Sequence, residues 1–339
     1  MADDPVADVM WMVRGAWVTM ALRAGIRLGV FDLLTEPRSA EALAEETRVD
    51  PAALGQLLSA LTWLGLVEQR EGGTYAGTPR GATLAVGHSS NLRSLVLMQS
   101  WLPNVAAWNH LDDAVRSGRG VYERVNGMEY WQHLSAHPDQ LAQFNQSMAR
   151  RADGQIAAIV AGVDLADAET VVDVGGGRGA MLAGVLGVWP HLTGVVADRP
   201  DVIEEADAAF AAQGLGSRAH GIASDFFESV PAGADVYFLA NVLHDWDDDD
   251  CRRILRTIRS AMDDHARLLI VERVLDAPGR SEGQERDLAF VDLHMLVAFG
   301  ARERRQGEYD ALLGDAGFGP SALATGSADW NVLEARPGA

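Results

Sequence analysis

The nine residues from Val171 to Gly179, VVDVGGGRG, constrain the fold more than any other stretch of the chain. Their β-branched, apolar start suits a strand that is buried on both faces of a sheet. The four glycines that follow have no Cβ, so they allow positive φ angles and let a ligand approach the backbone. Residues Met181 to Val188 then indicate a helix. This order of strand, glycine turn and helix predicts the first unit of a doubly wound nucleotide-binding domain.

The spacing of these glycines indicates which kind of nucleotide the turn would bind. Gly175, Gly177 and Gly179 form GxGxG, whereas dinucleotide-binding turns have GxGxxG and phosphate loops need a lysine followed by serine or threonine. A second apolar run, residues 193–197, ends in Asp198, whose carboxylate can accept both hydroxyls of a ribose. The pattern favours an adenosine-bearing ligand without phosphates. A glycine turn that serves packing alone is the alternative.

Length, charge and cysteine content exclude several classes of protein. The 339 residues are 48% hydrophobic, which is enough to fill the cores of two domains. The formal net charge of -20 would repel nucleic acid and anionic membranes, so we expect neither as a partner. The acidic start disfavours a signal peptide, no long apolar stretch follows, and the single cysteine, Cys251, excludes an internal disulfide framework. These features predict a cytoplasmic protein that acts on small molecules.

The chain contains no lysine, so its fixed positive side chains are all arginines. Schiff-base chemistry, pyridoxal phosphate attachment and the phosphate-loop interaction all need a lysine amine. The sequence therefore excludes these three mechanisms.

After residue 168 the sequence alternates between apolar runs and helical patterns. We expect strands at residues 171–174, 194–197, 218–221, 236–240, 267–272 and 330–335. Their short connections predict a mainly parallel sheet, which would bind ligands beyond the carboxyl ends of its strands. Candidate site residues lie at or just past those ends: Asp173, Gly175, Asp198, Asp225, His244 and Glu272.

Residues 7–34 carry apolar side chains at helical spacing, which predicts a helix with a stripe that needs covering. The stripe consists of Val9, Met12, Val13, Trp17, Met20, Ala21, Ala24 and Leu28. From the residues alone, burial inside the monomer and burial against a second subunit are equally open.

Residues 39–76 predict a helix-turn-helix followed by a short hairpin, the pattern of a winged helix. Ser39 and Asp50 are the expected N-caps of helices at residues 40–46 and 54–64, and Gly72-Gly73 marks the hairpin turn. Many winged helices bind DNA, but the second helix here has no basic residue to contact phosphates. We therefore interpret this segment as a dimerisation module.

Four motifs carry a resemblance to a known family. They are VVDVGGGRG, Asp198-Arg199-Pro200, Ser224-Asp225-Phe226-Phe227 and Leu243-His244-Asp245-Trp246. Over nearly its whole length the chain resembles the S-adenosylmethionine-dependent O-methyltransferases of the caffeate and isoflavone type, including bacterial natural-product members. The resemblance implies an α/β fold, with a Rossmann-like class I methyltransferase domain after an N-terminal, all-helical winged-helix dimerisation domain. It also implies a homodimer.

The resemblance further implies three segments and the roles of their residues. The dimerisation domain would cover residues 1–100, a helical connecting region lining the acceptor pocket residues 101–165, and the catalytic domain residues 166–339. The methyl donor S-adenosylmethionine, which leaves as S-adenosylhomocysteine, is expected at Asp173, Gly175, Gly177, Asp198, Asp225 and Phe226. The acceptor, a phenolic or similar small molecule, is expected at Phe144, Met148, Asp245 and Met295.

His244 is the candidate general base. A phenol has a pKa of about 10, and a neutral histidine with a pKa of about 6.5 is suited to take its proton once methyl transfer begins. Taken alone, His244 reads as a structural residue, and the resemblance favours the base. The acidic partners that the resemblance implies are Glu272 and Glu303, which would fix the ring tautomer and stabilise the imidazolium. An exposed helix charge is the alternative for Glu303.

No metal is expected, although the run Asp247 to Asp250 offers the clustered carboxylates that magnesium prefers. Acidic residues in a first helical turn, with arginines later, are also what the helix dipole favours.

The chain departs from many plant relatives at Ala240 and Ser224, which puts some cofactor contacts in doubt. One rival function is that of a relative that binds the same cofactor but catalyses hydroxylation or another non-methyl reaction, and such members tend to lack the histidine. The other rival is a ligand-sensing winged-helix regulator.

Overall fold

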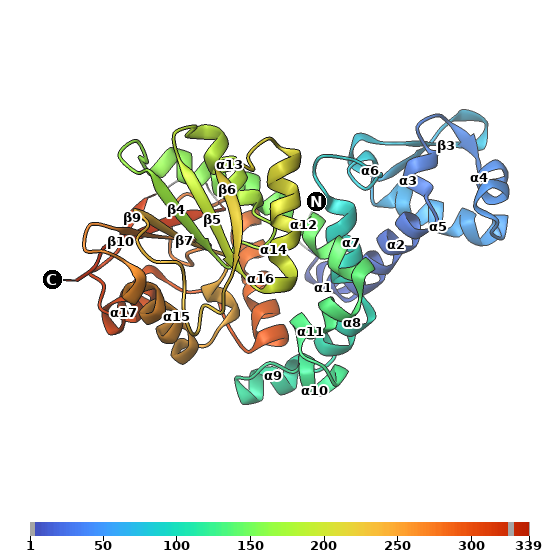
Figure 1. The fold of residues 1–339 in the computed structure, drawn as a ribbon. Coiled ribbons are helices and arrows are strands. Elements are labelled where there is room, and N and C mark those ends of the chain that lie inside the picture. The colour runs from blue at the N-terminus through green and yellow to red at the C-terminus, as the bar shows by residue number, and fades with distance from the viewer. Residues whose placement is uncertain (1–3, 325–328, 339) are drawn as a thin grey trace. The chain divides into compact units, whose positions relative to one another are not determined.

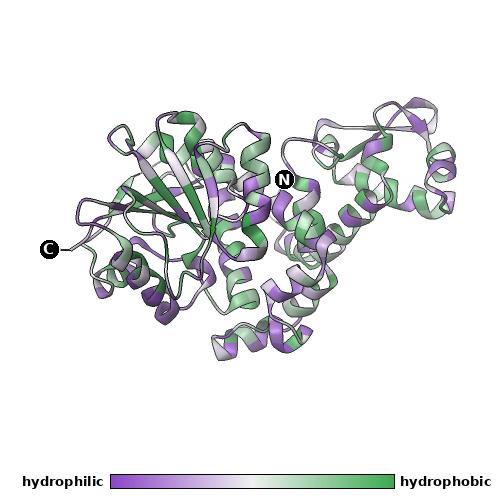
Figure 2. Cartoon of the chain, in the orientation of Figure 1, coloured by the Kyte–Doolittle hydropathy of each residue, from purple (hydrophilic) through white to green (hydrophobic). Residues whose placement is uncertain are grey.

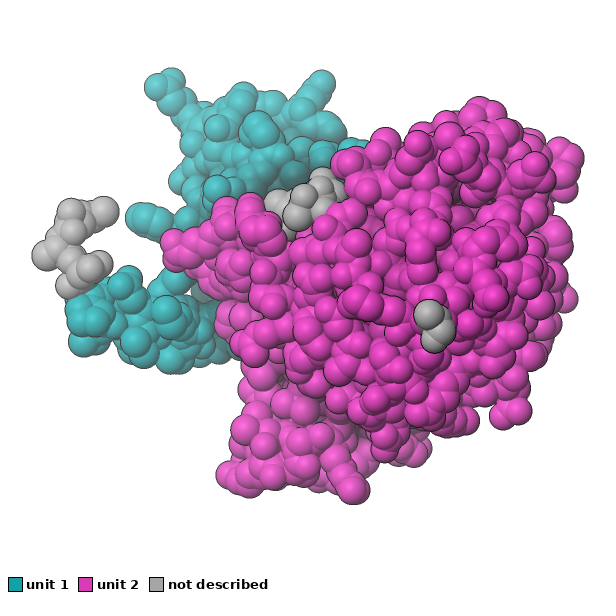
Figure 3. All heavy atoms as spheres, turned by 90° about the vertical axis from the view of Figure 1, so that its left-hand side faces the viewer, with its two compact units in different colours: residues 1–105, 131–150 teal, residues 106–130, 151–339 magenta. Residues whose placement is uncertain are grey.

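The computed structural model describes residues 4–324 and 329–338 of the chain (Figure 1). The chain forms two compact units, which Figure 3 shows in separate colours. Unit 1 comprises residues 1–105 and 131–150, and unit 2 comprises residues 106–130 and 151–339. The division into three segments, with boundaries near residues 100 and 165, stays a prediction.

The N-terminal helical region of unit 1 is broken twice. It consists of α1 (Pro5–Val13), α2 (Gly15–Arg27) and α3 (Val30–Leu33). The prediction of one continuous helix over residues 7–34 is therefore wrong. The second break lies at Gly29, whose left-handed φ of 70° ends a right-handed helix. Within the described chain, α1 has no buried residue, and Met12 and Trp17 are exposed by 73% and 70%. The predicted apolar stripe is therefore uncovered along α1.

The predicted helix-turn-helix and hairpin are confirmed. Ser39 Oγ accepts a hydrogen bond from the N–H of Ala42 in α4 (Ala40–Thr47), and Asp50 Oδ1 accepts one from Ala53 in α5 (Pro51–Trp63). The hairpin consists of β2 (Val67–Gln69) and β3 (Thr74–Gly77), and β1 (Arg38–Ser39) pairs with the free edge of β3. Because of this small antiparallel sheet, the N-terminal domain is not all-helical.

The core of unit 1 is formed by leucines of α4 and α5, such as Leu43, Leu58 and Leu61, none of which is exposed. The other helical elements before the large sheet are η1 (Glu71–Gly73), α6 (Pro79–Ala82), α7 (Leu92–Gln99), α8 (Leu102–Trp108), α9 (Leu111–Ser117), α10 (Tyr122–Asn126), α11 (Tyr130–Ala136) and α12 (Pro138–Gly162).

Among the described residues, unit 2 is built on a seven-stranded sheet with the order β6-β5-β4-β7-β8-β10-β9. Its strands are β4 (Thr170–Val174), β5 (Thr193–Asp198), β6 (Ala219–Ala223), β7 (Val236–Ala240), β8 (Arg267–Glu272), β9 (Ala322–Ala324) and β10 (Asn331–Ala335). The neighbours from β6 to β8 are parallel, whereas β10 and β9 run antiparallel at one edge. The predicted mainly parallel sheet is confirmed. The strand predicted at 218–221 is shifted to β6, and β9 was missed because it is too short to show a pattern.

The strands alternate their side chains between two hydrophobic cores. In β7, Tyr237 and Leu239 belong to one core, and Val236 and Phe238 belong to the other. The first core is covered by α15 (Asp248–Ala261) and α17 (Gln306–Asp315). The second is covered by the end of α12, α13 (Ala180–Val188) and α14 (Pro200–Ala212). Green, hydrophobic residues run along the central strands in Figure 2, as expected for a sheet with helices on both faces.

Two further elements of unit 2 position the site. They are η2 (Leu243–Asp245), which follows β7, and α16 (Glu282–Phe299), which follows β8. None of the described helices is long and apolar enough to cross a membrane.

Candidate active site

The candidate residues at the strand ends lie along one edge of the large sheet. Asp173 and Gly175 stand at the end of β4, Asp198 ends β5, Asp225 follows β6, His244 follows β7 and Glu272 ends β8. These strands are adjacent and parallel, so their carboxyl ends meet at the same edge. The structure therefore brings together the strand-end positions that the sequence predicted.

The glycine turn after β4 uses the conformational freedom of its glycines. Gly175, Gly177 and Gly179 have φ angles of 71°, 59° and 74°, a region that other residues rarely adopt. The N–H of Gly177 donates a hydrogen bond of 2.8 Å to Asp198 Oδ2, which ties the turn to the end of β5. No atom of the described residues lies within 4 Å of the place where a Cβ of Gly177 would stand. The turn thus presents open backbone beside the Asp198 carboxylate.

Asp173 lies directly beneath this turn and is fully buried. Neither of its carboxylate oxygens has a hydrogen-bond partner among the described residues. Burial, and to a lesser degree the charge of Asp198, raises the pKa of Asp173 to about 8. A buried carboxyl group without hydrogen bonds is unfavourable, so this position is built for something other than stability.

The loop after β6 brings aromatic rings to the same edge of the sheet. Asp225 is exposed, and its Oδ1 accepts a hydrogen bond of 2.9 Å from the N–H of Phe227. The Phe226 ring packs edge-on against Trp246 at 5.9 Å, and Phe227 does so at 4.8 Å. Trp246, to which sequence reasoning assigned no role, therefore links this loop to the turn that carries His244.

His244 lies in η2 with its ring buried against two carboxylates. Its Nδ1 is 3.1 Å from Glu272 Oε2 and 3.5 Å from Glu303 Oε1, and its Nε2 is 3.4 Å from Asp245 Oδ1. Glu272 and Glu303 are exposed by 0% and 1%, so the alternative that Glu303 is an exposed helix charge is wrong. The structure confirms the predicted meeting of His244, Glu272 and Glu303.

The pKa of His244 differs from the ordinary value assumed from the sequence. Burial alone would lower it, but the negative charges of Glu272, Asp245 and Glu303 outweigh burial and hold the pKa of His244 well above 6.5. The expectation of a histidine with an unperturbed pKa was therefore wrong. The sequence could not reveal this shift, because it depends on carboxylates 28 and 59 residues away along the chain.

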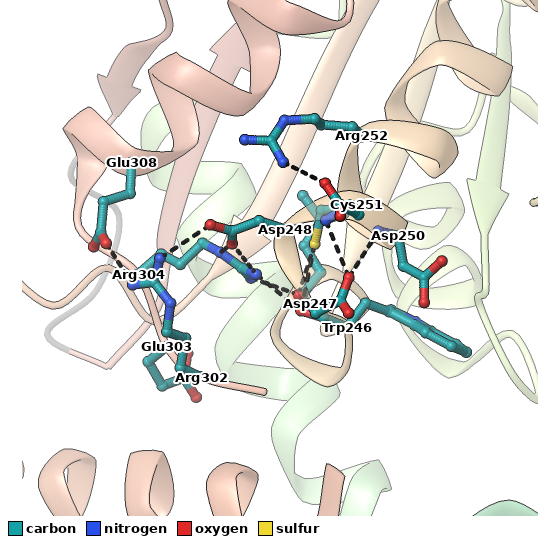
Figure 4. A network of polar contacts seen from close by, with 12 residues as sticks. Trp246, Asp247, Asp248, Asp250, Cys251, Arg252, Arg302, Glu303, Arg304 and Glu308 are labelled. Carbon is teal, nitrogen blue, oxygen red and sulfur yellow. Dashed lines mark hydrogen bonds and ion pairs between the residues drawn. The ribbon is translucent and has the colours of Figure 1, made fainter. Parts of the chain in front are cut away.

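The backbone of the His244 turn is held by two residues from elsewhere in the chain, of which Figure 4 shows Arg304 beside Trp246. Glu272 Oε1 accepts hydrogen bonds of 3.0 Å from the N–H groups of Val242 and Leu243. Arg304 is fully buried and donates to the carbonyl oxygens of Leu243 at 2.7 Å and Trp246 at 2.8 Å. Sequence reasoning missed Arg304, although an arginine next to a candidate catalytic carboxylate in a lysine-free chain was a signal.

Asp292 in α16 binds the backbone of Glu303, the other acidic residue of the cluster. Its Oδ1 accepts a hydrogen bond of 2.7 Å from the N–H of Glu303. Met295, on the same helix, is buried, and Asp245 is half-buried beside His244. Asp292 was also missed from the sequence, because it lies 11 residues from Glu303 and in no motif.

The two remaining candidates for the acceptor pocket belong to unit 1. Phe144 and Met148 lie on α12 and are half-buried, and the Phe144 ring packs edge-on against Trp131 at 5.5 Å. Their role in binding the acceptor stays a prediction.

Two clusters of this region offer carboxylates to a cation. His244, Glu272 and Glu303 each present one ligand atom, and these atoms lie within 4.8 Å of one another. The acidic run begins α15 as predicted, with Asp247 Oδ1 accepting hydrogen bonds from the N–H groups of Asp249 and Asp250. This cap is what a solvated helix N-terminus requires, so the run has a role without a metal.

Comparison with known proteins places this geometry in a family. A model of the O-methyltransferase domain matches residues 108–319, and a model of the O-methyltransferase dimerisation domain matches residues 10–87. The chain is 36% identical to a mitomycin biosynthesis 6-O-methyltransferase of Streptomyces lavendulae, over 99% of this chain and 95% of that protein.

Solved structures agree with this assignment. The fold is similar to a mitomycin 7-O-methyltransferase, with a TM-score of 0.91 and 35% identity over 98% of each chain. It is also similar to an O-methyltransferase from neocarzinostatin biosynthesis in complex with S-adenosylmethionine and 2-hydroxy-5-methyl naphthoic acid, with a TM-score of 0.82 and 30% identity over 94% of this chain and 96% of that one. The chain belongs to the family of S-adenosylmethionine-dependent O-methyltransferases.

Proposed function

We propose that the protein transfers a methyl group from S-adenosylmethionine to a phenolic or similar hydroxyl of a small-molecule secondary metabolite, with His244 as the general base. The observation that carries this proposal is the contact of His244 Nδ1 with two buried carboxylates, at 3.1 and 3.5 Å. Nδ1 is engaged there, so Nε2, which lies 3.4 Å from Asp245 Oδ1, is the nitrogen that we propose receives the proton of the acceptor.

The residues at the ends of β4, β5 and β6 suit the methyl donor. Gly177 offers open backbone, and the buried carboxyl group of Asp173 lacks a hydrogen-bond partner among the described residues. Gly175 and Gly177 would let the ligand approach, Asp198 would accept the ribose hydroxyls, and Asp225 with Phe226 would lie near the adenine. S-adenosylmethionine supplies a methyl group that is activated by the positive charge on its sulfur.

His244 then performs the proton transfer. Its Nε2 accepts the hydroxyl proton as the oxygen becomes nucleophilic, and the resulting imidazolium is stabilised by Glu272 and Glu303. Asp245, Met295, Phe144 and Met148 are the proposed residues that bind the acceptor. Proximity and orientation of the two reactants can contribute several kcal/mol to such a reaction.

His244 also separates this function from its rivals. Relatives of this family that catalyse a non-methyl reaction tend to lack the histidine, whereas here His244 is present and contacts two buried carboxylates. A DNA-binding regulator would need basic residues on α5, and this helix has none.

We keep the prediction that the reaction needs no metal. Glu272 Oε1 is committed to two backbone N–H groups, and His244 Nδ1 and both carboxylates have the arrangement of a base and its partners. Turnover that is unchanged after dialysis against a chelator would agree with this, and loss of turnover that added magnesium or zinc restores would contradict it.

We also propose that the protein is a cytoplasmic homodimer, with the three segments given above, that does not bind nucleic acid. The dimer rests on the match of residues 10–87 to a dimerisation domain and on the exposed apolar residues Val9, Met12 and Trp17. Sedimentation at micromolar concentration should show a dimer, and a monomer with full activity would contradict it.

The test of the function is a mass-spectrometric screen with labelled S-adenosylmethionine and a set of phenols. We expect one methyl ether and one S-adenosylhomocysteine per turnover. A product that has gained oxygen instead of a methyl group would favour the hydroxylating relative. Cofactor binding with no product from any acceptor, combined with specific DNA binding, would favour the regulator.

A further inference from the structure

Arg304 is the largest fully buried side chain among the described residues, and it contacts the turn that carries His244. Its Nη1 donates to the carbonyl oxygen of Leu243 at 2.7 Å, and its Nη2 donates to that of Trp246 at 2.8 Å. The same guanidinium meets Asp248 Oδ1 through Nε at 3.1 Å and Nη2 at 2.8 Å. Figure 4 shows Arg304 between Trp246 and Asp248.

The two carbonyl groups that Arg304 binds stand on either side of His244. Leu243 precedes the histidine and Trp246 follows two residues after it, so both ends of the turn are fixed to one rigid group. The turn itself is a three-residue 3-10 segment, which has too few internal hydrogen bonds to hold its own shape. Its position therefore depends on partners elsewhere in the chain.

Arg304 also follows directly on Glu303. The N–H of Glu303 donates to Asp292 Oδ1 at 2.7 Å, and the carbonyl of Arg304 accepts from the N–H of Leu275 at 2.9 Å, so the backbone of this pair is fixed at both residues. The side chain of Glu303 reaches His244 Nδ1, whereas that of Arg304 reaches the backbone around His244. One short segment thus contacts both the ring and its supporting turn.

We propose that Arg304, oriented by Asp248, is a positioning residue that sets the distance from His244 to Glu272 and Glu303. The guanidinium offers a planar fork of N–H groups, so it can bind two carbonyl groups and a carboxylate at once, which a lysine cannot do. Asp248 supplies the charge that a buried arginine needs. This inference deepens the proposed function and rests on it.

Catalysis is sensitive to such positioning. A displacement of about 1 Å at a catalytic group can lower turnover by roughly 10²-fold, even when the substituted residue is remote from the reaction. Arg304 touches neither reactant in this scheme, so its loss should lower kcat and leave the affinity for the methyl donor nearly unchanged.

The first variant is Asp248→Asn, with Asp249→Asn as its matched control. Asp248 has a side chain that is 42% exposed, so its substitution should not prevent folding. Asp249 is the next residue of the same helical turn, is 93% exposed and pairs only with Arg252 at 2.9 Å among the described contacts. We expect Asp248→Asn to lower kcat by roughly tenfold with little change in KM, and Asp249→Asn to behave as the parent protein.

The second variant is Arg304→Lys, which keeps the charge but loses the fork. We expect roughly a 10²-fold fall in kcat, without loss of donor binding in calorimetry. Since the charge is kept, a change in the titration of His244 would report its displacement from the carboxylates. If Arg304→Lys does not fold, Asp248→Asn carries the test, with Asp248→Glu as the conservative variant expected to recover part of the activity.

If the role of Arg304 were merely structural, its substitution would leave the pKa of His244 unchanged. This pKa is measured by NMR of labelled histidine in the unliganded protein. In both variants we expect the pKa of His244 to fall towards its ordinary value, because the ring moves away from Glu272 and Glu303. Normal kcat and an unchanged histidine titration in folded variants would overturn the proposal. A parent protein that methylates no phenol, with the histidine titration still altered in the variants, would overturn the proposed function and leave the positioning role standing.

Discussion

The glycine turn after β4 and the His244 turn after β7 lie at the same end of the parallel strands, but they are built in opposite ways. On the side of β4, β5 and β6, the glycine turn has three left-handed residues, an open face at Gly177 and a buried Asp173 without hydrogen bonds among the described residues. On the side of β7 and β8, the His244 turn is bound through its amides by Glu272 and through its carbonyls by Arg304. The first side keeps a buried carboxyl group without a hydrogen-bond partner among the described residues, whereas the second side hydrogen-bonds the backbone of its own turn.

This contrast separates two properties of the enzyme. Changes on the β4 to β6 side should alter the binding of S-adenosylmethionine, because the proposed donor site lies there. Changes on the β7 and β8 side should alter turnover, because the turn that is fixed there carries the proposed general base. Four measurements test whether the division holds.

The largest effect is expected at the base. His244→Ala should lower kcat by about 10²–10⁴-fold, the usual contribution of a general base, while the affinity for the donor stays nearly constant. An acceptor with a more acidic phenol should lose less, because it ionises without help. His265→Ala is the control, since this histidine is 70% exposed and lies 3.6 Å from Asp235. Equal losses on acidic and ordinary phenols would point to a positional role, and an unimpaired His244→Ala protein would refute the assignment.

The next effect is expected at the glycine turn. Gly177→Val should weaken donor binding by about 10-fold or more, because a branched side chain is strained at a φ of 59° and would occupy the open face. Gly187→Val, on α13, is the control, since no atom of the described residues lies within 4 Å of its Cβ position and no positive φ is required there. Calorimetry measures both. Normal donor affinity in a folded Gly177→Val protein would show that the ligand does not approach this turn.

The third effect is a pH dependence of turnover. The proposed base, His244, must be neutral to accept a proton, and the charges of Glu272, Asp245 and Glu303 hold its pKa above 6.5 in spite of burial. Activity should therefore rise with pH, with the midpoint of its acid limb above 6.5 in kcat/KM, which reports the free enzyme. Glu303→Gln should move that midpoint to lower pH, because one raising charge is lost. If the midpoint stayed at the same pH in Glu303→Gln, the charge of Glu303 would not raise the pKa of His244.

The sequence was sufficient where a pattern is local. The glycine turn, the N-caps Ser39 and Asp50, the strands β7 and β8 and the position of His244 all follow from residues close together in the chain. Even the meeting of His244 with Glu272 follows once the sheet is parallel, because the carboxyl ends of adjacent strands share an edge.

The sequence was not sufficient where an effect depends on distant partners. Arg304 lies 60 residues from His244 and its role rests on backbone carbonyls, which leave no mark on residue identity. Asp248 was interpreted through the helix dipole, which explains its helix position but not its contact with Arg304. The pKa of His244 is likewise raised by carboxylate charges against the effect of burial, and that of Asp173 is raised mainly by burial, and both depend on surroundings that only the folded chain brings together.

The smallest effect is one of stability, and it tests the β4 to β6 side without any ligand. The pKa of Asp173 is about 8 in the folded protein, whereas an unfolded aspartate has a pKa of about 3.9. A raised pKa contributes stability that is complete below the unfolded value and is lost as the pH rises through the folded value, here between about 4 and about 8. The side chain in Asp173→Asn cannot ionise, so at pH 8.5 the free energy of unfolding of this variant should exceed that of the parent by on the order of 1–3 kcal/mol, measured by denaturant unfolding. The variant should also bind the donor less well.

Asp235→Asn is the matched control at the opposite ends of the strands. Burial would raise the pKa of Asp235, but hydrogen bonds from the N–H groups of Glu169 and Thr170 lower it, so removing this carboxylate should destabilise the protein. If Asp173→Asn also destabilised the protein at pH 8.5, Asp173 would be a structural residue and the contrast between the two sides would fail.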